Sequence, residues 1–85
     1  MPPNESWKRE FVLEEIEVGF IFAACALKAY RAGRARDGAI AKARAITAME
    51  TVEGLLTDLS ATDQELPRTE LVKLRYAIYT LKPIQ

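Results

Sequence analysis

Apolar residues recur every three or four positions along most of the chain, and no segment shows the strict alternation that marks a half-buried strand. The helical spacing covers three segments, at about residues 5–32, 37–60 and 67–82. Alanine, the residue with the highest helix propensity, occurs thirteen times. The pattern therefore predicts an all-α fold in which residues 1–85 form one domain of three helices.

Capping residues indicate where the first two helices begin and end. Asn4 or Ser6 can cap the first helix, and Gly33 would end it, because glycine readily takes the left-handed conformation that follows a helix. Asp37 can cap the second helix. Only about four residues would then join the two helices, and so short a connection predicts a long antiparallel hairpin.

The third helix is predicted to be shorter than the other two. Residues 60–64, with the sequence SATDQ, interrupt the apolar spacing. Pro67 or Thr69 would open this helix, and it would end before Pro83, because the residue that precedes a proline avoids the α conformation. The expected architecture is a three-helix bundle made of the hairpin and this shorter helix.

Two apolar seams predict how the second and third helices pack. Each seam has the four-three spacing of residues that face another helix. The seams consist of Ala41, Ala45, Ala48, Val52, Leu55 and Leu59 in the second helix and of Leu71, Leu74, Ile78 and Leu81 in the third. Because the first seam begins with three alanines, we expect the backbones of the first two helices to approach each other closely.

The first helix carries two apolar stripes on roughly opposite sides. One stripe contains Leu13, Ile16, Phe20, Ala24 and Leu27, and the other contains Trp7, Phe11, Val18, Phe22 and Cys25. The third helix, about 24 Å long, is too short to cover a first helix of about 42 Å. We therefore expect a homodimer whose interface is the second stripe. The alternative is a monomer in which the third helix folds over that stripe.

Two small residues of the first helix carry further expectations. Gly19 lies in the apolar centre, where glycine is about 1 kcal/mol less favourable than alanine, and it predicts either a close approach of two backbones or a kink. Cys25 has apolar neighbours, and we interpret it as a small buried hydrophobic residue.

Composition excludes several classes of function. Twelve basic and twelve acidic residues give a net charge of zero, so no overall field attracts nucleic acid or an anionic membrane. The absence of histidine and the single cysteine exclude zinc fingers, disulfide scaffolds and catalysis that depends on histidine. With no apparent secretory signal and no uncharged run of spanning length, we expect a cytoplasmic protein without a membrane span, cofactor or nucleic-acid partner.

Four glutamates carry the alternative hypothesis of an enzyme. Glu14 and Glu17 in the first helix would lie at the same height of the hairpin as Glu50 and Glu53 in the second, and such carboxylates can hold magnesium or manganese. The pattern resembles the acidic helices of the MazG-type all-α nucleotide pyrophosphohydrolases, and this resemblance implies a hydrolase that depends on a divalent metal. The other interpretation is that these glutamates form solvated helix faces.

The turn of the hairpin is locally basic. Lys28, Arg31, Arg34 and Arg36 lie around a single acid, Asp37. This group can bind an acidic partner, or it can serve as a solubilising end of the hairpin. No aromatic residues alternate with the basic ones, so stacking on single-stranded nucleic acid is not predicted.

Small and large residues alternate across the first two helices in a way that resembles helical interaction modules. The series Ala26, Leu27, Tyr30, Gly33, Ala39 and Ala43 resembles the small-and-large alternation of tetratricopeptide-type hairpins over about half of the chain. Helix order and length are similar to those of MIT domains, flagellar export chaperones and small bacterial helical-hairpin proteins without an assigned function. The resemblance implies binding of protein partners. We therefore predict a non-catalytic interaction or scaffold module that self-associates through the first helix.

Overall fold

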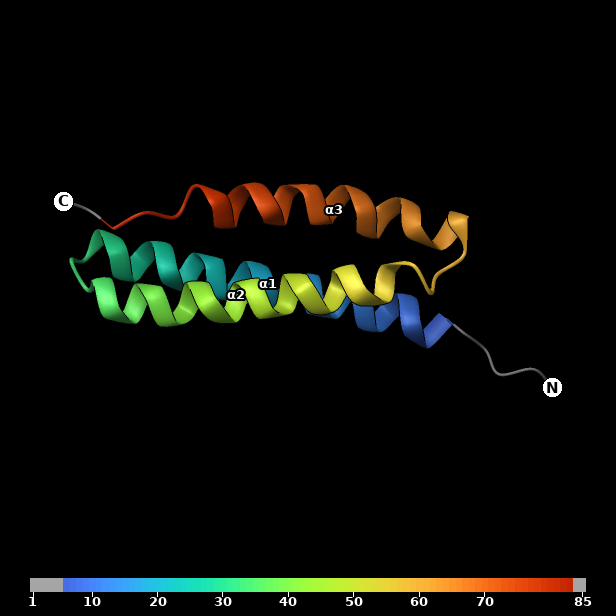
Figure 1. Ribbon diagram of the computed structural model, residues 1–85, viewed down its shortest axis with the longest axis horizontal. Coiled ribbons are helices and arrows are strands. Elements are labelled where there is room, and N and C mark those ends of the chain that lie inside the picture. Colours follow the sequence, from blue (N-terminus) through green and yellow to red (C-terminus); the bar gives the residue numbers. More distant parts are fainter. Residues whose placement is uncertain (1–5, 84–85) are drawn as a thin grey trace.

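The computed structural model describes residues 6–83, and these residues form three helices and no strand (Figure 1). Helix α1 spans Ser6–Arg31, α2 spans Ala35–Leu56 and α3 spans Ala61–Tyr79. Helix α2 runs antiparallel to α1, and α3 returns in the direction of α1, so the three helices pack side by side. The all-α prediction of a long hairpin with a shorter third helix is confirmed.

The tight turn between α1 and α2 is formed at Gly33, as predicted. Gly33 has a φ of +76°, which glycine adopts without strain. Its N–H donates to the carbonyl of Tyr30 at 3.1 Å, and the N–H of Arg34 donates to the carbonyl of Ala29 at 2.8 Å. This pair of hydrogen bonds is the Schellman motif that ends many helices. It reverses the chain within residues 32–34.

The predicted cap of α2 needs correction. For α1, the structure describes the helix from Ser6 onward, and the other cap candidate, Asn4, lies outside the described residues. Helix α2 begins before Asp37, with Arg34 at the cap position and no side-chain cap hydrogen bond. Asp37 instead lies in the first turn, where a negative charge is favoured by the helix dipole, and its carboxylate is 4.0 Å from the Arg34 guanidinium.

Helix α3 begins six residues before the predicted start at Pro67, and α2 correspondingly ends at Leu56. Ser60 is the cap of α3, because its Oγ accepts a hydrogen bond from the N–H of Asp63 at 3.2 Å. The segment SATDQ was therefore wrongly interpreted as an interruption, since serine followed three residues later by an acid is a helix start. Pro67 lies inside the helix, where its side chain is fully buried.

The core is formed largely by the two predicted seams. The first seam, which runs along α2 and ends at Leu59 just after it, is buried except for Leu55, which is partly buried. The second seam runs along α3 and ends at Leu81 just after it. Its four residues are each exposed by 5% or less. Lys42 adds a polar contact between these elements, because its Nζ donates to the carbonyl of Leu81 at 3.1 Å. The packing of α2 and α3 was thus correctly predicted from spacing alone.

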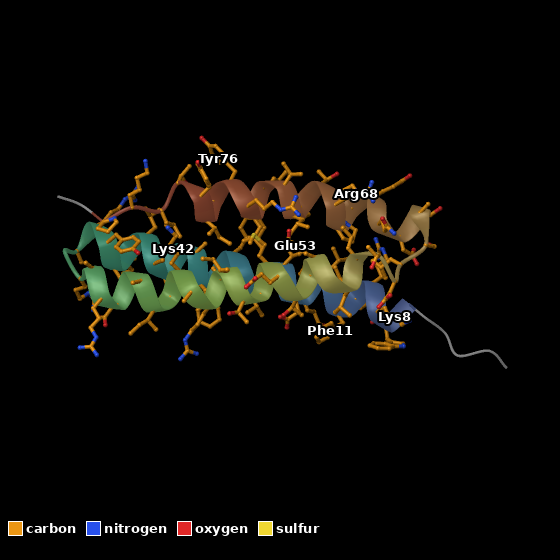
Figure 2. The ribbon with its side chains drawn as sticks, viewed as in Figure 1. Lys8, Phe11, Lys42, Glu53, Arg68 and Tyr76 are labelled. Carbon is orange, nitrogen blue, oxygen red and sulfur yellow. The ribbon has the colours of Figure 1, made fainter. Side chains whose placement is uncertain are left out.

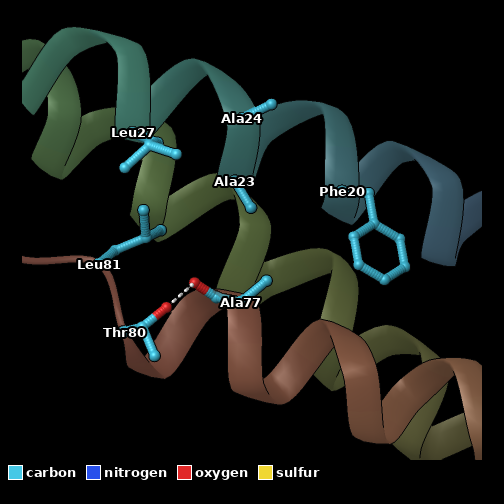
Figure 3. Close-up of a pocket in the computed structure, with 7 residues that line it drawn as sticks. All are labelled: Phe20, Ala23, Ala24, Leu27, Ala77, Thr80 and Leu81. Carbon is cyan, nitrogen blue, oxygen red and sulfur yellow. Dashed lines mark hydrogen bonds between the residues drawn. The ribbon is translucent and has the colours of Figure 1, made fainter. Parts of the chain in front are cut away.

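The buried face of α1 differs from the prediction. Its centre is formed by Val12, Ile16, Gly19, Ala23, Ala26 and Tyr30. Ala24 and Leu27 of the first predicted stripe are exposed, and Leu13 and Phe20 are only partly buried. The small residues between the two predicted stripes allow α2 and α3 to pack against α1 there. The first stripe borders this buried face, whereas Trp7, Phe11 and Cys25 of the second stripe are exposed. Phe20 and Leu27 border α3 at a shallow hollow of about 240 Å³ (Figure 3).

Gly19 leaves space on α1 for the Leu74 side chain of α3, so the close contact there joins a backbone and a side chain rather than the two backbones that the sequence predicts. A Cβ atom at this position would lie 2.7 Å from Cδ2 and 3.2 Å from Cδ1 of Leu74. Carbon atoms in contact prefer separations of about 3.5–4.0 Å, so any side chain at position 19 would displace Leu74.

Two glycines of α2 allow a matched test of close packing. A Cβ on Gly38 would lie 2.9 Å from Cγ of the buried Tyr30 and closer still to Cδ1 and Cε1, whereas a Cβ on Gly54 would meet nothing within 4 Å. We expect Gly38→Ala to lower the free energy of unfolding by about 1–2 kcal/mol, because the clash outweighs the gain in helix propensity. Gly54→Ala should raise it by up to about 1 kcal/mol.

Urea unfolding of the two variants and the parent at one protein concentration checks this prediction. Equal stabilisation by both alanines would contradict it and would mean that Tyr30 does not pack against the start of α2.

Candidate interaction surface

The outer face of α1, opposite its buried centre, carries exposed apolar side chains. Trp7 is 58% exposed, Phe11 is 39% exposed and Ile21 is 56% exposed. Figure 2 shows Phe11 on the side of the bundle away from α3. Because these side chains lie along one helix, they form a strip rather than the scattered apolar residues found on any protein surface.

The strip has the spacing of a helix-pairing seam. Positions 7, 11, 14, 18, 21, 25 and 28 follow the alternating four-three steps of a heptad pattern. We call these seven residues the outer seam: Trp7, Phe11, Glu14, Val18, Ile21, Cys25 and Lys28. Val18 is partly buried and the other six are exposed. Four of them belong to the interface stripe predicted from the sequence. Glu14, Ile21 and Lys28 were not predicted to belong to it, although their spacing is present in the sequence.

Phe22, the fifth residue of the predicted interface, is partly covered by α2. The guanidinium carbon of Arg44 lies 5.8 Å from the centre of the Phe22 ring, within the range of a cation–π contact. Phe22 and Cys25 also border a shallow hollow of about 190 Å³ together with Ile40 and Arg44 of α2. Phe22 therefore belongs to the boundary between the hairpin core and the outer seam.

Cys25 is exposed, so its interpretation as a buried hydrophobic residue is wrong. The next residue, Ala26, is fully buried, and a step of one residue turns a helix by about 100°. The burial of Ala26 therefore places Cys25 at the edge of the buried face. Its thiol is free, and it lies on the outer seam.

The four glutamates of the enzyme hypothesis lie on exposed helix faces. Glu14 and Glu17 are exposed on α1, and Glu50 and Glu53 are exposed on α2. Glu53 pairs with Arg75 of α3, with 2.6 Å between Oε2 and Nη2. Among residues 6–83, no three histidine, cysteine, aspartate or glutamate side chains lie close enough together to hold a metal ion.

The basic group at the hairpin turn is exposed. Lys28, Arg31, Arg34 and Arg36 all face solvent, and Asp37 lies beside Arg34. Two further basic residues that follow in α2 contact other parts of the chain, since Lys42 binds the carbonyl of Leu81 and Arg44 stacks over Phe22. The four residues predicted to meet an acidic partner are exposed, and so is Arg44 despite its contact with Phe22.

A second exposed strip lies on α3 and was not predicted. Val72, Tyr76 and Tyr79 are 58%, 72% and 84% exposed, and they share the outer face of α3 at four-three spacing. Figure 2 shows Tyr76 on the opposite side of the bundle from Phe11. The helical spacing of these three residues was available in the sequence.

Comparison with protein-family models, curated proteins and solved structures finds no match to this chain. Within the part of the chain that the structure describes, no helix combines the length and the apolar character needed to span a membrane.

Proposed function

We propose that this protein is an interaction module that acts by binding rather than by catalysis, and that it self-associates through the outer seam of α1. The observation that carries the proposal is the exposure of Trp7, Phe11 and Ile21 along one helix face. Burying such side chains is worth about 1.5–3 kcal/mol each, and a soluble monomer gains nothing from lining them up. A second copy of the chain is the simplest partner, since closed twofold dimers are the commonest oligomers.

The relation of the seam to the rest of the bundle supports this function. The centre of α1 is already buried by α2 and α3, so a partner on the outer seam can bind without any rearrangement of the core. An exposed heptad seam is the surface that pairs helices in coiled coils. The fold would then serve to hold α1 straight and present this face.

The test of self-association is a substitution at the middle of the seam. Ile21→Glu should raise the dissociation constant of the dimer at least about 100-fold, because each subunit loses a buried aliphatic side chain and gains an unpaired buried charge. The fold should be unaffected, since Ile21 is 56% exposed. Light scattering across a dilution series gives the mass, and circular dichroism gives the helical content.

Val72→Glu is the matched control. Val72 is also β-branched and is 58% exposed, but it lies on the outer face of α3. This variant should retain the oligomeric state of the parent. A mass of 9.5 kDa for the unmodified protein at micromolar concentration would overturn the proposed function.

A further inference from the structure

The charges on the outer side of α1 are divided between its two halves. Glu10, Glu14 and Glu17 precede Ile21, and Lys28 and Arg31 follow it. All five charged side chains are exposed, and none of them forms an ion pair within residues 6–83. The outer side of α1 therefore has an acidic half and a basic half, represented in the outer seam by Glu14 and Lys28, and the exposed Ile21 lies between them.

This arrangement is self-complementary only when two helices pair antiparallel. Glu14 and Lys28 are each seven residues from Ile21, a distance of about 10 Å along the helix. A twofold axis near Ile21 would place Glu14 of each copy against Lys28 of the other. In parallel pairing each charged residue would instead face its own copy, and like charges would repel.

We propose, on the basis of the proposed function, that two copies pair through antiparallel α1 helices that cross near Ile21. The occupant of the seam is a second copy of this chain, and the acidic partner of Lys28 and Arg31 is the Glu10–Glu17 segment of that copy. Glu14 lies opposite Lys28, and Glu10 lies within about one turn of Arg31. Ile21 packs against its own copy at the centre, where water is excluded most completely.

A charge exchange tests the pairing. Glu14→Lys alone and Lys28→Glu alone each replace two attractive pairs in the dimer with two repulsive ones, and each should raise the dissociation constant at least about tenfold at low salt. The double variant Glu14→Lys/Lys28→Glu restores opposite charges across the interface. Its dissociation constant should return to within about threefold of the parent value. In a parallel dimer the double variant would be no better than the single ones.

Crosslinking tests the orientation independently of charge. In the antiparallel dimer the two Cys25 residues lie about 12 Å apart along the helices, whereas position 21 of one copy lies beside position 21 of the other. A bismaleimide with a reach shorter than that separation should crosslink the Ile21→Cys/Cys25→Ser variant into a dimer. The same reagent should leave the parent protein, with Cys25 alone, as uncrosslinked chains.

The outcomes separate this inference from the proposed function. A parent protein that is monomeric at micromolar concentration would overturn both. Two other results would overturn the antiparallel pairing alone, provided that Ile21→Glu dissociates the dimer. One is a double charge variant that dimerises as weakly as the single variants. The other is crosslinking of the parent protein through Cys25.

Discussion

Leu74→Ala should strongly lower the free energy of unfolding of this protein. Leu74 is fully buried, and its side chain packs against Gly19, where α3 meets α1. Removing a buried leucine side chain costs about 2–5 kcal/mol, because apolar contacts are lost and a cavity remains. For a domain of this size the midpoint of thermal unfolding should fall by at least about 10 °C.

Leu66→Ala is the control for this substitution. Leu66 lies in the same helix but is 46% exposed, so its truncation should cost well below half as much. Both variants should be compared at one protein concentration, because self-association would itself raise the apparent stability. Equal losses for the two variants would mean that α3 does not dock through its predicted seam.

Gly19 supplies a second check on the same contact. Gly19→Ala in the parent would push a methyl group against Leu74, but in the Leu74→Ala background the clashing atoms are gone. The alanine should then stabilise α1 through its helix propensity and partly fill the cavity. The two substitutions should therefore be non-additive, with a coupling energy of about 1 kcal/mol or more.

Much of the fold could be predicted because the relevant residues act locally. The turn at Gly33 needs only the left-handed conformation of one glycine, and the seam of α3 needs only the spacing of its leucines and isoleucine. The start of α3 differs from the prediction because proline favours the first turn of a helix, which points to Pro67, whereas the cap at Ser60 sets the boundary.

The buried face of α1 could not be found by following its largest apolar residues. The centre of this face contains the buried residues Gly19, Ala23 and Ala26, and the absence of a side chain at Gly19 leaves room for Leu74. Residue size is not part of a hydrophobic count. The same error placed Cys25 in the core. The exposed seam was only partly recognised because Ile21 belongs to neither predicted apolar stripe and because Glu14 and Lys28 are charged. Charges at seam positions are nevertheless a common means of fixing the orientation of paired helices.

The buried alanines of α2 are expected to be sensitive to enlargement. Ala45 has no exposed surface, and it lies in the core where α2 packs against α1. Ala45→Leu would insert three carbon atoms into a space that is already filled. The helices would have to separate or side chains leave their preferred rotamers, which costs about 1–3 kcal/mol.

Ala43→Leu provides the matched comparison, because Ala43 lies two residues earlier on the exposed face of α2. The same chemical change there should alter the free energy of unfolding by less than about 0.5 kcal/mol. Chemical unfolding of both variants measures the difference directly. If Ala45→Leu also changed the free energy of unfolding by less than about 0.5 kcal/mol, the two helices would not be in close contact at this position. The assignment of the small residues of α1 to the buried face, and of the outer seam to the exposed face, would then be contradicted.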